Sequence, residues 1–385
     1  MDLDLLRKEI DKIDDELIEL LVKRSELACD VAKYKKENNM EVFQQGREQF
    51  ILDRVSEKVP DEMKSSAAII FQTIMDLSKC RQSYLLTAMR DFKIHKHMSG
   101  RPSAATVTKG SYSAVACEKL FEGKCDVKYV RHFEDVFEAV EKGEVDYGVL
   151  PIVNSTAGDV SDTYDLMGKH NFYICKTTDI HITHVLAAKK GTKLSDIKNV
   201  FSHEMALKQC SGFMNENGFT GIEASTTAKG AQIVAKTDET DCAAICSAMC
   251  AEMNGLEILA ENIADIKDNY TRFILISNRL EVSENASVIS LSLTLPHTPG
   301  SLYRLLTRFS YCGLNLLRIE SKPMPSNFAD VKSDAFDFIF YLDFEGNIRN
   351  RAVVKLLNNL ETEMKYYRFL GNYEATSEEN KEIDT

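Results

Sequence analysis

Two groups of polar residues in this sequence could carry the chemistry of a small anionic substrate. The first lies in residues 269–273, where Thr271 and Arg272 precede an apolar run that ends before Ser277. Such a run predicts a short buried strand, and strand ends are common ligand sites in α/β proteins. A hydroxyl and a fixed positive charge would therefore be held at such a strand end. Considered alone, an edge-strand threonine beside a surface arginine is the commoner arrangement.

The second group interrupts an apolar helical face near the N-terminus. Apolar residues recur at alternating three- and four-residue spacing from Leu3 to Val31, which predicts one amphipathic helix of about 35 residues. Arg24 occupies a position where this pattern expects an apolar residue, and Lys35 follows about three turns later on the same face. A charge on a buried face is costly unless it is paired; a snorkelling arginine is the alternative for Arg24.

Two further helices are predicted to complete this region. Residues 44–58 carry Arg47 and Glu48, and residues 61–89 carry Ser78 and Gln82 on one face. The three helices would point cations, a carboxylate and hydrogen-bonding groups into one pocket, without a nucleophile–base pair. Such a pocket suits a dianion and the stabilisation of charge in a transition state. The first helix, near 50 Å long, also implies a partner helix from a second chain.

Residues 1–90 resemble the all-helical chorismate mutases along nearly their whole length. The matching positions are Leu3, Leu6, Arg7, Ile10, Arg24, Lys35, Arg47, Glu48, Ser78 and Gln82. The resemblance implies rearrangement of chorismate to prephenate. It also implies the roles: the carboxylates are held by Arg7, Arg24 and Arg47, the ether oxygen faces Lys35 and Gln82, the ring hydroxyl is taken by Glu48, and the site is lined by Ser78. Gln44 stands where many members carry an aspartate.

A distance along the first helix bears on how such a site is assembled. Arg7 and Arg24 are seventeen residues apart, which corresponds to about 25 Å on one straight helix. Both side chains therefore cannot reach one small substrate from the same helix. We expect each pocket to take Arg7 from the partner chain.

Residues 106–280 alternate strand-like and helix-like segments in two sets, which predicts two α/β lobes around a cleft. Residues 91–105 lack periodicity and are interpreted as a linker. A Gly110-Ser111 turn precedes a helical run; it could bind an anion at the helix N-terminus, although a plain capped helix is commoner.

This region resembles prephenate dehydratases over about 170 residues. The matching segments are 109–113, Pro151 to Ser155, Ser202-His203 with Gln209-Cys210, and Asn269 to Phe273. The resemblance implies that prephenate loses water and carbon dioxide to give phenylpyruvate. It assigns proton donation to Thr271, organisation of the charged site to Arg272, substrate positioning to Asn154, Ser202 and Gln209, and carboxylate binding to Ser111 and Ser113.

Two alternatives stay open, and the first of them rests on two departures from the family pattern. Val153 replaces a usual glutamate, and Val107-Thr108 replaces a usual Gly-Pro before Lys109. One alternative is an amino-acid-sensing binding protein whose middle region has lost catalysis. Another is that arogenate is used in place of prephenate.

Residues 287–374 predict a βαββαβ order, a ferredoxin-like α+β arrangement. The alternation of Ile289, Leu291 and Leu293 with hydroxyl residues predicts a half-buried first strand. The region resembles an ACT domain, which implies a phenylalanine site formed by Gly300, Ser301, Leu302, Glu320 and Ser321. Ser301 replaces the usual alanine and Lys322 the usual arginine, a change that loses the planar fork. A module for dimerisation is the alternative.

Composition limits the remaining classes. The net charge of −12 argues against non-specific nucleic-acid binding, and neither a signal peptide nor a membrane span is evident. Cys242, Cys246 and Cys250 are predicted to share one helical face, which suggests a metal site. Without a fourth ligand nearby, small buried residues are the favoured interpretation. His181, His184 and His203 are interpreted as structural. We predict no cofactor or metal, a cytoplasmic homodimer or higher homo-oligomer, and a polar tail over residues 375–385.

Overall fold

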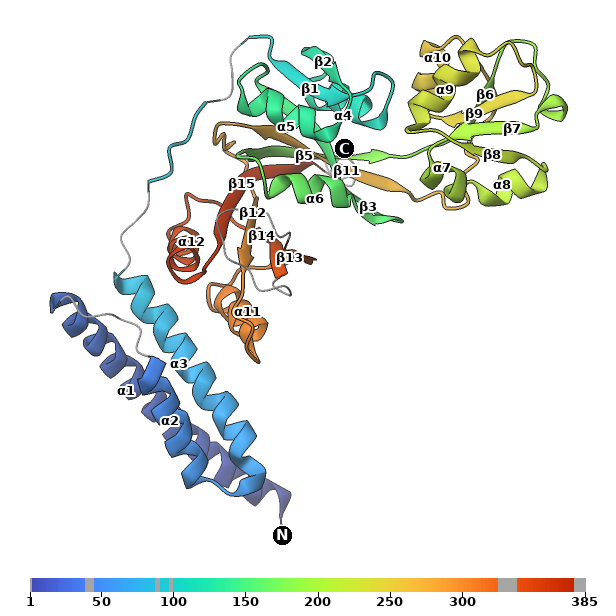
Figure 1. Ribbon diagram of the computed structural model, residues 1–385. Coiled ribbons are helices and arrows are strands. Elements are labelled where there is room, and N and C mark those ends of the chain that lie inside the picture. Colours follow the sequence, from blue (N-terminus) through green and yellow to red (C-terminus); the bar gives the residue numbers. More distant parts are fainter. Residues whose placement is uncertain (1, 39–44, 87–90, 97–99, 325–337, 377–385) are drawn as a thin grey trace. The chain divides into compact units, whose positions relative to one another are not determined.

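The computed structural model describes residues 2–38, 45–86, 91–96, 100–324 and 338–376 of the chain (Figure 1). The described residues divide into two compact units. One contains the N-terminal helices together with the elements between Leu291 and Phe369, and the other contains the remaining elements. No helix in the described ranges is long and apolar enough to cross a membrane.

The N-terminal region is helical, as predicted. Its elements are α1 (Leu3–Glu37), α2 (Gln45–Lys58), the 3-10 turn η1 (Asp61–Met63) and α3 (Lys64–Leu86). Asp2 caps α1 by accepting a hydrogen bond from the backbone of Asp4. The predicted 35-residue helix is confirmed. Gln44, where we expected the second helix to begin, lies outside the described residues.

Most of the apolar stripe of α1 is not covered by its own chain. In this helix Cys29 and Ala32 are buried. The apolar side chains along the stripe are between 42% and 66% exposed, and they include Leu3, Leu6, Ile10, Ile13, Leu17 and Leu27. An exposed apolar face of this length is typical of an interaction surface.

The larger lobe of the second unit is a mixed sheet flanked by helices. Its strand order is β5 (Tyr173–His181), β11 (Tyr270–Ser277), β3 (Tyr147–Asn154), β1 (Ser103–Val107) and β2 (Asp126–Val130), and β4 (Gly158–Asp159) pairs with β3. The helices are α4 (Tyr112–Phe121), α5 (Phe133–Glu141) and α6 (Ser161–Met167). The predicted linker was too long at its C-terminal end, because β1 begins at Ser103 and buries Ala104 and Ala105 against its neighbours.

The smaller lobe is a five-stranded sheet with helices on both faces (Figure 1). The strand order is β10 (Glu257–Ala260), β6 (Val185–Ala188), β9 (Cys242–Cys246), β7 (Asn199–Ser202) and β8 (Thr220–Glu223). The helical elements are η2 (Leu194–Asp196), α7 (Glu204–Gln209), α8 (Ser211–Glu216), α9 (Thr227–Lys236) and α10 (Ala248–Met253). A Cβ on Gly230 would lie 2.6 Å from the Phe201 carbonyl oxygen, so α9 approaches β7 more closely than a side chain allows. The two α/β lobes predicted from the alternating pattern are therefore present.

The idea that three cysteines share one helical face is wrong. Cys242 and Cys246 belong to β9, where residues four apart point to one face of a sheet, and Cys250 belongs to α10. All three are buried in the apolar core of the smaller lobe, as the preferred interpretation expected. All ten cysteines are free thiols; the cytoplasmic location itself stays a prediction.

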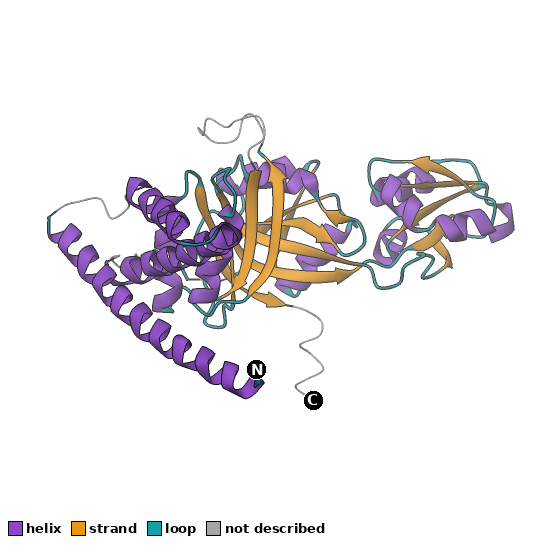
Figure 2. Ribbon diagram, turned by 90° about the horizontal axis from the view of Figure 1, so that it is seen from below, coloured by secondary structure: helices purple, strands orange, loops and turns teal. Residues whose placement is uncertain are grey.

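The last elements follow the predicted βαββαβ order. They are β12 (Val288–Thr294), α11 (Ser301–Tyr311), β13 (Leu316–Pro323), β14 (Phe338–Glu345), α12 (Arg351–Glu363) and β15 (Tyr367–Thr376) (Figure 1). The strands run β13-β14-β12-β15 across the sheet. Figure 2 shows the helices of the chain in purple and its strands in orange. The expectation that β12 is half-buried is wrong. Ser290 and Ser292 are buried, and their hydroxyls are satisfied there by those of Tyr373 at 2.6 Å and Tyr366 at 3.3 Å.

Candidate active sites

The structure places Thr271 and Asn154 directly opposite each other on β11 and β3. The Asn154 amide donates a hydrogen bond to the Thr271 hydroxyl oxygen at 2.9 Å. The ladder slips immediately beyond this pair, between Arg272 and Phe273, where Pro151 has no N–H to contribute. Bulges of this kind are frequent beside active sites, because they redirect a side chain.

Asn154 is itself held firmly, so the amide has one orientation toward Thr271. Its side-chain nitrogen donates to the Asn269 side-chain oxygen at 2.7 Å, and Asn269 is buried. Its side-chain oxygen accepts from the Thr156 hydroxyl at 2.8 Å and from the Ala157 backbone at 2.8 Å. The Thr271 hydroxyl, by contrast, has no acceptor for its own hydrogen among the described residues. It is therefore available to donate to a bound molecule.

A line of hydrogen bonds extends from this pair into the smaller lobe. The Gln209 side-chain nitrogen lies 3.3 Å from the Thr156 hydroxyl, and its oxygen lies 3.0 Å from Nε2 of His184. The Tyr112 hydroxyl lies 3.4 Å from the other ring nitrogen of His184. Burial lowers the pKa of His184. The imidazole is therefore neutral and, by its partners, donates from Nε2 to Gln209.

The other predicted serines of this region form no hydrogen bond with the Asn154–Thr271 pair in the described residues. Ser111 caps α4 and donates to the Val107 carbonyl at 2.8 Å, while Ser113 is buried in the first turn of the same helix. Ser202 is also buried, and it donates to the Ile245 carbonyl at 2.7 Å within the smaller lobe. The structure therefore gives Ser202 a core partner, and its role in positioning substrate stays a prediction.

Arg272 faces away from Thr271, because successive residues of a strand alternate between faces. Its guanidinium makes two 2.7 Å hydrogen bonds to the carboxylate of Asp179, the residue opposite it on β5. On the other side Arg272 pairs with Val153 of β3. The glutamate that Val153 replaces would thus stand opposite an arginine that already has a bidentate carboxylate partner. Its loss leaves Arg272 paired.

His181 and His203, like His184, make hydrogen bonds within the protein that give them structural roles. The His181 ring nitrogen lies 2.7 Å from the Lys267 carbonyl, and the ring stacks on Tyr270. His203 caps α7 by accepting from the backbone of Met205 at 3.2 Å.

In the helical region, α1 and α3 are joined by two hydrogen bonds that involve three of the predicted site residues. The Arg24 guanidinium donates to the Ser78 hydroxyl at 2.9 Å, and the Gln82 amide donates to the Ala28 carbonyl at 2.7 Å. Burial lowers the pKa of Arg24, yet a guanidinium stays protonated in proteins. A positive charge is thus held against a hydroxyl in a partly buried place.

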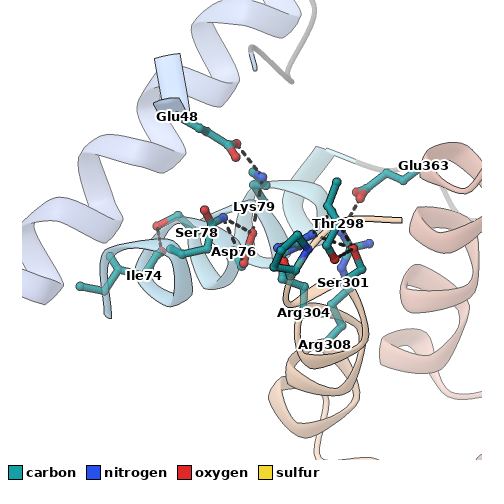
Figure 3. Close-up of polar contacts among 12 residues, drawn as sticks. Glu48, Ile74, Asp76, Ser78, Lys79, Thr298, Ser301, Arg304, Arg308 and Glu363 are labelled. Carbon is teal, nitrogen blue, oxygen red and sulfur yellow. Dashed lines mark hydrogen bonds and ion pairs between the residues drawn. The ribbon is translucent and has the colours of Figure 1, made fainter. Parts of the chain in front are cut away.

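The remaining predicted residues of this region lie on α1 and α2. Glu48 on α2 forms an ion pair with Lys79 on α3 at 2.5 Å (Figure 3). Arg47 is exposed, with its guanidinium 5.1 Å from the centre of the Phe50 ring. Lys35 is partly buried near the end of α1, and Arg7 is exposed beside Asp4. The single chain therefore brings Arg24 to Ser78 and pairs Glu48 with Lys79, the residue that follows Ser78 on α3. Arg7 lies seventeen residues before Arg24 on α1.

The predicted effector residues lie at the start of α11 and on β13. Gly300 has a φ of 78°, a left-handed conformation that favours glycine, and it precedes the first turn of α11. The Ser301 hydroxyl accepts from Arg304 at 2.9 Å and lies 2.8 Å from the Thr298 hydroxyl (Figure 3). Leu302 is exposed. Along β13, Glu320 lies on the same face as Lys322, and Ser321 lies on the opposite, exposed face.

Sequence reasoning missed three residues that the geometry adds. Asn269 falls inside a matching segment and Thr156 directly follows one, but only the fold shows that both contact Asn154. Lys79 follows Ser78 and lies one turn before Gln82. Helical spacing could have suggested it, whereas its pairing with Glu48 required the structure.

Comparison with known protein families matches both regions. Residues 6–83 match the chorismate mutase type II family, and residues 107–281 match the prephenate dehydratase family. The bifunctional chorismate mutase/prephenate dehydratase of Aquifex aeolicus is 30% identical over 374 residues, which cover 96% of each chain. The arogenate dehydratase/prephenate dehydratase 1 of Arabidopsis thaliana is 35% identical over 273 residues, 69% of each chain.

A solved structure supports the same assignment for the later part of the chain. Prephenate dehydratase from Arthrobacter aurescens, in complex with L-Phe, superposes with a TM-score of 0.63 at 30% identity, covering 71% of this chain and 89% of that one. The near-complete coverage by the Aquifex relative joins the helical and the α/β regions in one known architecture. This chain therefore belongs to the bifunctional chorismate mutase/prephenate dehydratases.

Proposed function

We propose that this chain uses two separate sites, one for each reaction of its family. The helical region converts chorismate to prephenate, and the bilobal region converts prephenate to phenylpyruvate, in the synthesis of phenylalanine. The observation that carries the second assignment is the contact between Asn154 and Thr271 at 2.9 Å, which leaves the threonine hydrogen free for substrate. For the first, it is the Arg24–Ser78 contact between α1 and α3.

The mutase site works by electrostatics and positioning, because a pericyclic rearrangement needs no covalent help from the protein. Arg24, Arg47 and Arg7 bind the two substrate carboxylates. Lys35 and Gln82 stabilise the negative charge that grows on the ether oxygen as its bond to carbon breaks. In addition, the ring hydroxyl is bound by Glu48, and the cavity is lined by Ser78.

The dehydratase site eliminates a hydroxyl and a carboxylate from one ring. The Thr271 hydroxyl donates to the departing oxygen, which leaves as water, while the ring carboxylate leaves as carbon dioxide and its electron pair completes the aromatic ring. Asn154 keeps the Thr271 oxygen in place by donating to it. Ser111 and Ser113 at the start of α4 bind a carboxylate, a role favoured by the backbone N–H groups of a helix N-terminus.

The mutase site requires two chains. Arg7 and Arg24 are about 25 Å apart along α1, and the exposed apolar stripe of α1 offers a long surface for a second copy. In the resulting homodimer, Arg7 of one chain completes the pocket that holds Arg24 of the other.

Residues 287–374 form an ACT domain that binds phenylalanine and mediates feedback inhibition by this end product. The βαββαβ order and the left-handed turn at Gly300 support this assignment, as does the complex of the Arthrobacter aurescens relative with L-Phe. Feedback requires that phenylalanine bind one state of the protein more tightly than another. The five residues of this effector site are Gly300, Ser301, Leu302, Glu320 and Ser321.

A second substrate has a specific observation in its favour. The Arabidopsis relative, at 35% identity, is named for arogenate as well as prephenate. Arogenate differs from prephenate by an amino group in place of a keto oxygen, outside the ring that loses water and carbon dioxide. The same site could therefore eliminate water and carbon dioxide from it, giving phenylalanine directly.

One assay tests the whole assignment. Purified chain is given chorismate, prephenate or arogenate in separate reactions, and product is followed with and without phenylalanine. We expect phenylpyruvate from both chorismate and prephenate, with phenylalanine lowering the rate. If prephenate accumulates as the end product, the middle region is a sensor without catalysis; faster turnover of arogenate would make it the preferred substrate.

A further inference from the structure

Lys79 is a charged residue of the helical region to which the family resemblance assigns no role. Its ammonium lies 2.5 Å from a carboxylate oxygen of Glu48 on α2 and 3.5 Å from Asp76 on its own helix (Figure 3). The side chains of Lys79 and Glu48 are only 27% and 22% exposed. The exposed pair of Lys12 and Glu9, for comparison, has side chains 70% and 59% exposed. The Lys79–Glu48 pair is therefore better shielded from water than an ordinary surface pair.

The surroundings favour the orientation of Lys79 toward α2. On its other side, α3 packs against α11 and α12 around a small cavity that Lys79, Arg308 and Lys355 all line. Arg308 is paired there with Glu363. Like charges across a partly buried cavity repel one another. The ammonium is thus stabilised beside Glu48 and Asp76 rather than beside the two cations.

We propose that Lys79 is a positioning residue for Glu48 in the mutase reaction; this rests on the proposed role of Glu48 as the group that binds the ring hydroxyl. Lys79 holds one carboxylate oxygen and thereby fixes the rotamer of Glu48. The second oxygen then points to the substrate, since a carboxylate can accept several hydrogen bonds at once. Lys79 also neutralises Glu48 near a dianionic substrate, which the free carboxylate would repel.

A purely structural role predicts something different. If the ion pair only joined α2 to α3, removing Lys79 would loosen the bundle and weaken catalysis whatever residue stood at position 48. A positioning role predicts that the effect of Lys79 disappears once Glu48 has been changed. A double-mutant cycle separates the two cases, because it measures the coupling of one residue to the other.

The experiment uses the full chain with Lys79→Met, Lys79→Arg, Glu48→Gln and the Lys79→Met/Glu48→Gln double variant. Lys64→Met is the matched control, since Lys64 lies on the same helix in an exposed pair with Asp61 at 2.6 Å. Mutase kcat and KM are measured for each variant. Dehydratase turnover of prephenate by the same preparation reports the integrity of the rest of the chain.

We expect Lys79→Met to lower mutase kcat about 10-fold, because small displacements of a positioned group are costly, with KM within about twofold. Lys79→Arg should recover most of that loss, and Lys64→Met should show none. In the Glu48→Gln background, Lys79→Met should change kcat less than twofold. An equal loss in both backgrounds, or none in either, would overturn the proposal while leaving Glu48 in place. If Glu48→Gln alone leaves kcat unchanged, the role of Glu48 and this proposal fall together.

Discussion

Replacing Thr271 with valine is expected to lower the dehydratase kcat by about 100-fold or more and to leave mutase turnover unchanged. Valine keeps the β-branched shape that suits β11, so the strand and the buried Phe273 next to it should be preserved. What is lost is the hydroxyl that accepts from Asn154 and that we propose donates to the leaving oxygen. The measurement is phenylpyruvate formation from prephenate, with chorismate consumption recorded on the same preparation.

The matched control for this variant is Thr178→Val. Thr178 is a buried threonine of the neighbouring strand β5 and lies opposite Phe273. The Thr178→Val variant should retain the wild-type dehydratase turnover within about threefold. A buried threonine-to-valine change away from the site affects stability more than chemistry. Dehydratase activity of Thr271→Val close to that of the wild type would remove Thr271 from the mechanism, whatever the other contacts of the site.

The second large effect concerns the two arginines of α1. Arg7→Ala and Arg24→Ala should each lower mutase turnover by about 100-fold or more, since each removes a charge that binds substrate and transition state. After denaturation and refolding of an equal mixture, activity should return to about one quarter of the wild-type value. Half of the dimers are then mixed, and each mixed dimer has one intact site of two, provided that the pocket takes Arg7 from the partner.

The arrangement of charges makes this prediction specific. An intact site in a mixed dimer combines Arg24 from the Arg7→Ala chain with Arg7 from the Arg24→Ala chain. Refolding either variant alone is the control and should restore nothing. Subunit exchange is verified with two tags of different size. If verified mixed dimers stay inactive, both arginines serve a site within one chain, and the shared pocket is excluded.

The sequence was most informative where residues repeat or cluster along the chain. The apolar spacing from Leu3 to Val31 predicted a helix whose observed bounds are Leu3–Glu37, because helical periodicity depends on neighbouring turns alone. The short segment around Thr271 predicted a strand, and β11 occupies Tyr270–Ser277. Local pattern was sufficient in both cases.

Residues whose roles depend on distant partners could not be predicted in this way. Asn154 and Thr271 are 117 positions apart, and only the register of β3 with β11 brings them together. Lys79 forms an ion pair with Glu48, which lies on another helix. Ser290 was expected to face solvent because serine usually does, but the Tyr373 hydroxyl satisfies it inside the protein. Tertiary pairing decided each of these positions.

The uncovered stripe along α1 has a consequence for how the two reactions respond to the amount of protein. If the mutase pocket takes Arg7 from a second chain, as proposed, it exists only while two chains remain associated, whereas Thr271 and Asn154 belong to one chain. Dilution of the protein would then abolish mutase activity before dehydratase activity. The dissociated chain would consume prephenate supplied from elsewhere without producing any of its own.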